Sequence, residues 1–171
     1  MNLFLRQGFE PTTVEDIAHA AGISRRSYFR YFGSKDEVFA EALTSFGGTI
    51  AETLTGRPAD ESLWLALRHS FDPLLEQAQA VSDPEALGRL MLERPTLHQG
   101  KYPIWQSQVA TARLPRLPDD GTETQSLRAE ALAAAAITCL HVAQTQWLAP
   151  DEERTLNELL DTTMGAVHPL A

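Results

Sequence analysis

The chain has 171 residues, 43% of them hydrophobic and 22% charged, and its formal net charge is -9. This composition is typical of a globular protein with a sizeable core, and the single cysteine, Cys139, excludes a disulfide-rich fold. The start of the chain lacks the apolar stretch of a signal peptide, and the apolar run 131–140 is about half the roughly 20 residues that a membrane helix needs. We therefore expect a cytoplasmic protein with no membrane partner.

The charge is distributed unevenly along the chain. Residues 1–45 hold five basic and six acidic side chains, whereas residues 46–171 hold nine basic and seventeen acidic ones. The acidic excess of the second part would repel DNA. Any DNA binding should therefore depend on one correctly oriented face.

Two short helices are predicted near the N-terminus, after an apolar helical stub that ends at Gly8. Thr13 and Asp16 resemble a capping box, which predicts a helix over residues 14–21. Gly22 permits a tight turn, and Ser24 is a favourable N-cap for a second helix. This arrangement is a helix-turn-helix, whose second helix lies in the major groove of DNA with its first turn against the base edges.

The second helix is basic although the chain is acidic. Residues 24–35 contain three arginines, one lysine and no acid. Arginine can bind guanine through two hydrogen bonds, worth roughly 1–3 kcal/mol of discrimination, so Arg25 and Arg26 in the first turn are candidates for base contacts. A basic, solvated helix face in a protein that does not bind DNA is the alternative interpretation.

Several further side chains of this region are candidates for contacts with DNA. Ser27 could donate to a phosphate or a base, and Tyr31 and Lys35 should lie on the phosphate side. Lys35 also begins the next helix, where free backbone amides favour an anion. The complete set of candidate DNA-binding residues is Thr13, Ser24, Arg25, Arg26, Ser27, Phe29, Arg30, Tyr31 and Lys35.

The rest of the chain shows helical periodicity and no sustained alternation, so we predict an all-α fold. Ser34 caps a long helix over residues 35–54, which Gly47 and Gly48 would bend or loosen. The other predicted helices cover residues 61–80 with a kink at Pro73, 84–93, 96–112 with an interruption at Pro103, 123–148 and 151–167. We expect a domain over residues 1–46 and a second helical domain over 47–171.

Four stretches of the first domain resemble the DNA-binding domain of TetR-type (tetracycline repressor family) transcriptional regulators: Thr12–Ala18, Ala20–Ser24, Tyr28–Phe32 and Ser34–Asp36. The resemblance covers about residues 3–46. It implies a ligand-responsive, sequence-specific DNA-binding regulator, usually a repressor, that binds a palindromic double-stranded operator as a homodimer. The family has a longer first helix, of which Leu3-Phe4 and Gly8-Phe9 match the end, so we expect that helix to be shortened. Phe29 stands where the family often has tyrosine, so we expect it to contact a thymine methyl group or a sugar.

The resemblance also assigns tasks to the second domain. The last two predicted helices would pair with those of a second subunit as a four-helix bundle, and burial within one subunit is the alternative. A small-molecule effector would bind among the middle helices in a mostly apolar pocket. The candidate effector residues, each of which could instead be ordinary core, are Trp64, Phe71, Met91, His98, Tyr102, Trp105 and His141.

We expect neither an enzyme nor a metal or cofactor site. No metal-ligand spacing surrounds His98 or His141, and the sequence holds no phosphate-binding glycine loop or nucleophile elbow. Cys139 is predicted to be a buried packing residue and not a redox-sensing thiol. The alternative function is a helical small-molecule-binding or interaction protein that no longer binds DNA, which the short first helix suggests.

Overall fold

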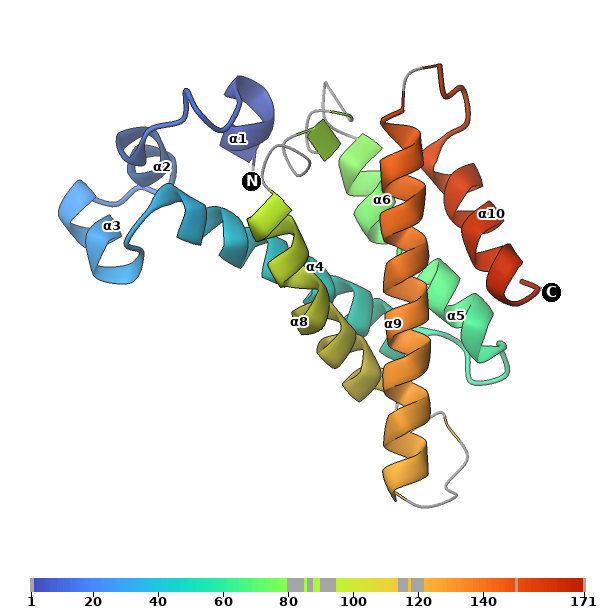
Figure 1. Cartoon of the computed structure of the whole chain (residues 1–171). Helices are drawn as coiled ribbons and strands as arrows, with labels where there is room; N and C mark the ends of the chain where they lie inside the picture. Colours follow the sequence, from blue (N-terminus) through green and yellow to red (C-terminus); the bar gives the residue numbers. More distant parts are fainter. Residues whose placement is uncertain are drawn as a thin grey trace.

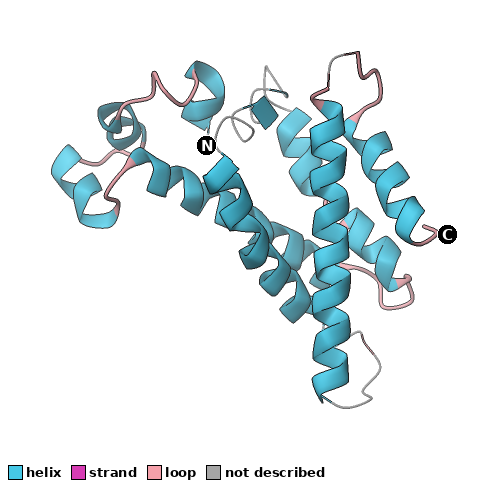
Figure 2. Ribbon diagram, in the orientation of Figure 1, coloured by secondary structure: helices cyan, strands magenta, loops and turns pink. Residues whose placement is uncertain are grey.

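The computed structural model describes residues 2–79, 85, 88, 89, 95–113, 117, 122–149 and 151–170. Every regular element in this part of the chain is an α-helix (Figure 2), which confirms the predicted all-α class. The predicted helix over residues 84–93 lies mostly outside the described residues. In chain order the helices are α1 (Asn2–Gln7), α2 (Val14–Ala20), α3 (Arg25–Tyr31), α4 (Lys35–Gly56), α5 (Leu63–His69), α6 (Asp72–Gln79), α8 (Pro95–Arg113), α9 (Thr122–Trp147) and α10 (Leu156–Val167).

The helices form two groups, which α4 joins (Figure 1). Helices α1, α2 and α3 gather at one end of α4, and α3 lies at the extreme tip of the molecule. The other end of α4 enters a bundle with α5, α6, α8, α9 and α10. Helix α3 is thus carried well away from the bundle.

A small aromatic core holds α1 against α4. The ring centroid of Phe4 lies 5.1 Å from that of Phe9 and 5.5 Å from that of Phe39, and all three rings are buried. Leu43 completes this cluster. Such aromatic pairs stabilise beyond their buried area, which explains how a helix of only six residues stays docked.

The larger core lies within the bundle, and α4 contributes to it as well. Ile50 and Leu54 of α4 are fully buried there together with side chains of α5, α8, α9 and α10. Among the described helices, α9 is long and apolar enough to cross a membrane. Its buried face, which includes Ile137 and Leu140, packs in this core, and a core helix passes the same test of length and composition.

Among the described helices, α4 and α8 share an extensive contact. The indole Nε1 of Trp105 donates a 2.8 Å hydrogen bond to the carbonyl oxygen of Leu43. At Gly47 an added Cβ would lie 2.1 Å from Oε1 of Gln108 and 2.5 Å from Cδ1 of Trp105. Gly47 is therefore needed for close approach, and α4 continues through it without the predicted loosening.

The two proline expectations were wrong in instructive ways. The single helix predicted over residues 61–80 is replaced by α5 and α6. Helix α5 ends at His69, because the carbonyl of His69 would need the N–H of the residue four positions later, and that residue is Pro73, which has none. Pro73 itself lies in the first turn of α6, where it is tolerated. Helix α8 continues through Pro103, whose ring is exposed while Lys101 and Trp105 on either side are buried.

The last helix begins later than predicted and docks through a buried arginine. Thr155 and Glu158 form a capping box, so α10 begins at Leu156 and not near residue 151. Arg68 of α5 is 7% exposed and contacts carboxylates of Asp72 and Asp161. These carboxylates neutralise the buried guanidinium, and the contact to Asp161 ties α5 to α10.

We expect Gly47→Ala to destabilise the protein and Gly48→Ala, its matched control, to leave it unchanged or more stable. The added methyl group at residue 47 meets the buried Trp105 ring, and overpacking of this kind costs about 1–3 kcal/mol. No atom lies within 4 Å of the corresponding position at Gly48, where alanine gains about 0.5–1 kcal/mol of helix propensity. Urea unfolding measures both, and equal stabilities for the two variants would contradict the packing.

Candidate functional site

The α2–α3 pair is built by the predicted caps. The backbone N–H of Asp16 donates to Oγ1 of Thr13 at 3.1 Å, and the Asp16 carboxylate accepts from the N–H of Thr13 at 2.9 Å. Hydrogen bonds from the Thr13 hydroxyl and N–H lower the pKa of Asp16. Gly22 has φ of +66°, and the side chain of Ser24 accepts from the N–H of Ser27 at 3.0 Å. The helix-turn-helix therefore forms as predicted.

The buried inner face of this helix pair is small. Ala18 and Tyr28 are buried, at 3% and 1% exposed, whereas Ala21 and Ile23 are exposed. The hydroxyl of Tyr28 donates a 2.8 Å hydrogen bond to the carbonyl of Ser34, which ties α3 to the start of α4. Burial, followed by the nearby acids of α4, raises the pKa of Tyr28.

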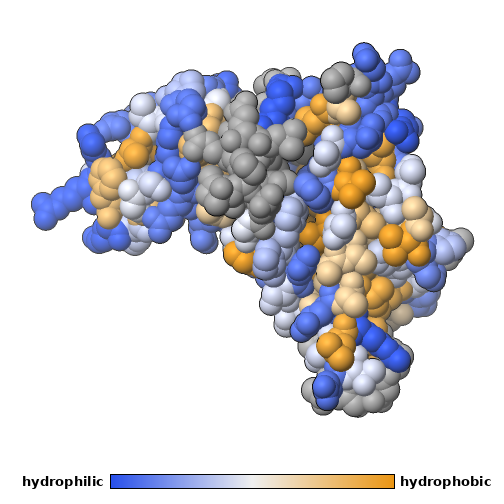
Figure 3. Space-filling model, viewed as in Figure 1, coloured by the Kyte–Doolittle hydropathy of each residue, from blue (hydrophilic) through white to orange (hydrophobic). Residues whose placement is uncertain are grey.

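The exposed residues of α3 include one cation without a described partner and two large rings. Arg26 is exposed and has no hydrogen-bond or ion-pair partner among the described residues. Phe29 and Tyr31 are 48% and 61% exposed, high values for large rings. In Figure 3 the tip of the molecule that carries α3 shows hydrophobic side chains among strongly hydrophilic ones. The guanidinium carbons of Arg25 and Arg30 lie 5.5 and 4.7 Å from the ring centroids of Phe29 and Tyr31. Exposed guanidinium groups of this kind suit base edges.

The other two arginines of α3 are held by neighbours within the domain. Nη1 of Arg25 lies 2.5 Å from Oε1 of Glu15 on α2, with both side chains more than half exposed. Nη2 of Arg30 donates to the hydroxyl of Tyr31 at 2.7 Å. Exposed pairs such as that of Arg25 contribute little to stability, but they restrict where the guanidinium points.

Lys35 is also occupied within the protein. Its Nζ donates to the carbonyl oxygens of Phe9, Glu10 and Thr12 at 2.8, 3.1 and 3.4 Å, and its side chain is 23% exposed. No local sequence pattern predicts these contacts, because the partners are backbone atoms more than 20 residues away. A role in contacting phosphate stays a prediction.

Three of the candidate effector residues come together between α8 and α9. The hydroxyl of Tyr102 lies 2.9 Å from Nδ1 of His141, and the Tyr102 ring meets the edge of Trp105 with centroids 6.0 Å apart. Trp64 and Phe71 are buried elsewhere in the larger core, where Nε1 of Trp64 donates to the carbonyl of Met164 at 3.1 Å. Met91 and the side chain of His98 lie outside the described residues.

A buried lysine joins this cluster, and sequence reasoning missed it. Lys101 is 2% exposed, and its Nζ lies 4.5 Å from the ring centroid of Trp105. Burial lowers the pKa of Lys101 to about 7. Burial, and after it the charge of Lys101, lowers the pKa of His141. The four-residue spacing from Lys101 to Trp105 was the available signal, since it places both on one helix face.

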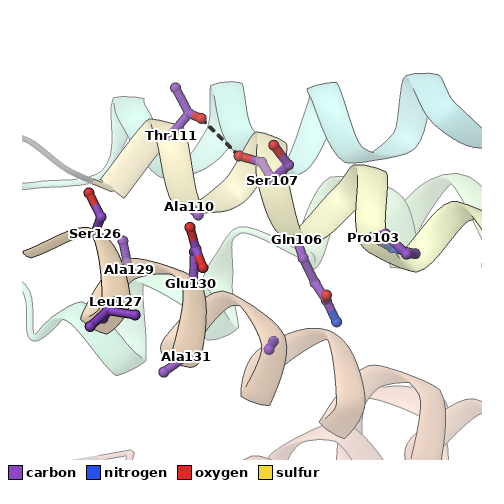
Figure 4. A pocket seen from close by; sticks show the side chains of 11 residues that line it. Pro103, Gln106, Ser107, Ala110, Thr111, Ser126, Leu127, Ala129, Glu130 and Ala131 are labelled. Carbon is purple, nitrogen blue, oxygen red and sulfur yellow. Dashed lines mark hydrogen bonds between the residues drawn. The ribbon is translucent and has the colours of Figure 1, made fainter. Parts of the chain in front are cut away.

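Two open grooves run along α8, and none of the candidate effector-binding residues lines either groove. One, of about 580 Å³, lies between α8 and the first half of α9 and is lined by small or polar side chains such as Ser107, Ala110 and Glu130 (Figure 4). The other, of about 440 Å³, lies between α4 and α8. The described residues contain no group of three or more potential metal ligands.

An exposed apolar stripe follows α9. Leu127 and Val142 are 61% and 48% exposed, and Ala131 and Thr138 are exposed between them at helical spacing. In Figure 3 hydrophobic side chains run along the part of the surface that α9 occupies. Cys139, also on α9, is buried as predicted, and burial raises the pKa of its thiol.

Comparisons with known proteins agree with this geometry. Residues 1–42 match the family model of bacterial regulatory proteins, tetR family. Over 75 residues the chain is 39% identical to the HTH-type transcriptional regulator TcmR of Streptomyces glaucescens, an alignment that covers 44% of this chain and 33% of TcmR. It is 28% identical to the putative mycofactocin biosynthesis transcriptional regulator MftR of Mycobacterium tuberculosis, over 98% of this chain and 84% of MftR.

The fold has a solved counterpart. The crystal structure of Thermus thermophilus FadR, a TetR family transcriptional repressor in complex with lauroyl-CoA, matches with a TM-score of 0.62 and 22% sequence identity. The match covers 100% of this chain and 91% of the FadR chain. At this identity the likeness concerns the fold.

We expect Tyr28→Phe to lower the free energy of unfolding by about 1 kcal/mol, because the Ser34 carbonyl loses a buried hydrogen bond. The matched control is Tyr31→Phe, whose hydroxyl is at the surface and whose loss should change stability by less than about 0.5 kcal/mol. Chemical denaturation followed by circular dichroism compares them. A Tyr31→Phe variant as destabilised as Tyr28→Phe would show that the α3–α4 tie is not what stabilises the domain.

Proposed function

We propose a function for this chain from its membership, through residues 1–42, of the tetR family of bacterial regulatory proteins. The chain is a ligand-responsive, sequence-specific DNA-binding transcriptional regulator, and a repressor. It acts in the cytoplasm as a homodimer on a palindromic operator. The observation that carries the proposal is that Arg26, Phe29 and Tyr31 are exposed on α3, at the tip of an otherwise acidic protein.

Recognition would rest on a few contacts. Arg26 is the free guanidinium for a base edge, and Arg25 and Arg30 reach the DNA from restrained positions. Thr13, Ser24 and Ser27 lie at helix N-termini, where hydroxyls and free amides suit phosphate oxygens. Because the acidic bundle repels DNA elsewhere, affinity comes from this one face.

Dimerisation through α9 and α10 would double these contacts. One short helix reads few base pairs, whereas two copies about 34–36 Å apart read successive major grooves on one face of the duplex. Helices α9 and α10 pack on each other, α9 exposes Leu127 and Val142, and α10 exposes Thr162, Gly165 and Ala166. Small and apolar side chains on two adjacent helices are suited to a four-helix bundle.

The effector would bind in the region of Tyr102, Trp105 and His141, with Lys101 as a further polar group. Trp64 and Phe71 would belong to its apolar surroundings, and Met91 and His98 remain candidates. The Trp105 hydrogen bond to α4 gives this region a direct route to the DNA-binding end. An effector that prefers one position of α4 shifts the equilibrium by its difference in affinity, and DNA must weaken the effector to the same extent.

Selection of bound sites from random double-stranded DNA tests the proposal, and Arg26→Ala sharpens it. We expect wild-type protein to enrich a two-fold symmetric site, and Arg26→Ala to lose about 1–3 kcal/mol of discrimination at one base pair of each half-site. Uniformly weaker binding with unchanged base preference would refute the role of Arg26. Failure of the wild-type protein to enrich any site at low salt would favour the helical small-molecule-binding alternative.

We expect Val142→Glu to convert the dimer to monomers, because an unpaired charge buried in an interface costs about 3–5 kcal/mol, roughly a 10²–10³-fold weaker association. Ser45→Glu adds the same charge at an exposed position of α4 and should leave the dimer intact. Sedimentation velocity measures the mass of each variant. A Val142→Glu protein that sediments like the wild type would place the interface elsewhere.

A further inference from the structure

We propose that Lys35 is a positioning residue: its ammonium group holds the loop of residues 8–13 against the start of α4 and thereby sets the orientation of α2 and α3, in place of a contact with phosphate. The consequence for DNA rests on the proposed function. The contact itself does not, since it lies entirely within this chain.

The hydrogen-bond geometry of Lys35 is the first observation. An ammonium group has three N–H donors, and Nζ has three carbonyl acceptors, those of Phe9, Glu10 and Thr12, at 2.8 to 3.4 Å. Nζ also lies 3.6 Å from the Glu10 carboxylate and 4.6 Å from the centre of the Phe9 ring. A phosphate could bind this group only by displacing one of these partners.

The loop that Lys35 holds is closed from within as well. Gly8 has φ of +86°, and the buried hydroxyl of Thr12 donates to the Gly8 carbonyl at 2.6 Å. Hydrogen bonds from the loop carbonyls to Lys35 therefore fix a segment that is already folded on itself. The segment ends at Thr13, the N-cap of α2, so its position determines where α2 begins.

The position of α2 determines the position of α3. The two helices are joined by a short turn in which the N–H of Ile23 donates to the carbonyl of Ala18 at 2.9 Å, and they pack on each other. On its other side α3 is tied to Ser34, the residue before Lys35, by the hydroxyl of Tyr28. The recognition helix is thus held to the start of α4 at two points, and Lys35 supplies the one that acts through α2.

Arginine is the decisive substitution at this position. Three carbonyl oxygens converge on one nitrogen, an arrangement that a tetrahedral ammonium satisfies and a planar guanidinium with dispersed donors does not. A lysine that contacts phosphate is replaced by arginine with its charge and its salt dependence kept. Lys35→Arg and Lys35→Met should therefore behave alike if Lys35 positions the loop, and differently if it contacts DNA.

The experiment compares Lys35→Arg, Lys35→Met and Thr12→Val in the full chain, with Arg6→Met as the control. Arg6 is an exposed cation of the same domain, so its substitution reports the effect of losing one charge. Thr12→Val loosens the same loop without changing charge. Amide hydrogen exchange of residues 8–16 gives the structural readout, and binding to the duplex selected by the wild type, over a series of salt concentrations, gives the functional one.

We expect exchange of residues 8–16 to become at least about tenfold faster in both Lys35 variants, the equivalent of about 1.4 kcal/mol. The affinity for DNA should fall about tenfold in Lys35→Arg, Lys35→Met and Thr12→Val. Lys35→Arg and Thr12→Val keep the charge, so their affinity should depend on salt concentration as that of the wild type does. Lys35→Met loses one charge, so its salt dependence should equal that of Arg6→Met. Unchanged exchange in both Lys35 variants would overturn the proposal. Two results together would also overturn the proposal. They are wild-type affinity in Lys35→Arg and a slope of affinity against salt concentration that is about 0.9 smaller in Lys35→Met than in Arg6→Met, which corresponds to one phosphate contact. If the wild type binds no duplex, the proposed function fails, and the exchange measurement alone decides the role of Lys35.

Discussion

The arrangement of the molecule depends on α4 being one continuous helix shared by two hydrophobic cores. Phe39 and Leu43 are buried in the aromatic core of the DNA-binding end, and Ile50 and Leu54 are buried in the bundle. Phe46 packs against both cores. A helix fixed at both ends transmits displacement as a rigid body, so α4 cannot shift in the bundle without moving α1, α2 and α3. The proposed boundary after residue 46 is therefore a division of surfaces and tasks, and the helix itself passes through it unbroken.

The second constraint is electrostatic, and it explains why the recognition face is so small. Because the net charge of the chain is -9, the protein as a whole is not attracted to DNA. In the proposed function each cation near the tip must therefore contribute through its position and orientation. Arg25 pairs with Glu15, and Arg30 donates to the Tyr31 hydroxyl. The Lys35 ammonium donates to a backbone carbonyl of the protein itself. Arg26 is left exposed without a partner among the described residues. Donors that are oriented before binding lose little side-chain entropy on binding, so in the proposed function a small contact face could still discriminate between sequences.

Local signals in the sequence were sufficient wherever the structure is determined by neighbouring residues. The caps Thr13, Ser24 and Ser34 and the turn at Gly22 are encoded within a few residues, and each begins or ends a helix where predicted. The prediction at Pro103 was wrong because burial of Lys101 and Trp105 outweighs the cost of one missing hydrogen bond on an exposed helix face. Hydrophobic periodicity alone does not reveal this balance of energies. The partners of Lys35 and Lys101 were invisible for a related reason: they are set by packing between segments far apart in the chain, and lysine is rarely buried.

The proposed regulation of DNA binding by an effector would depend on how the two cores are joined. Trp105 reaches α4 at Leu43, a residue of the DNA-binding core, and on its other side meets the Tyr102 ring, whose hydroxyl contacts His141 of α9. Gly47 lets α8 lie so close that it cannot move independently of α4. An effector that separates Tyr102 from His141 must therefore displace α8, and with it the carbonyl that Trp105 holds. Because the same contacts connect both ends, operator DNA that fixed α3 would in the proposed function also restrict Tyr102 and His141, so the coupling would act in both directions.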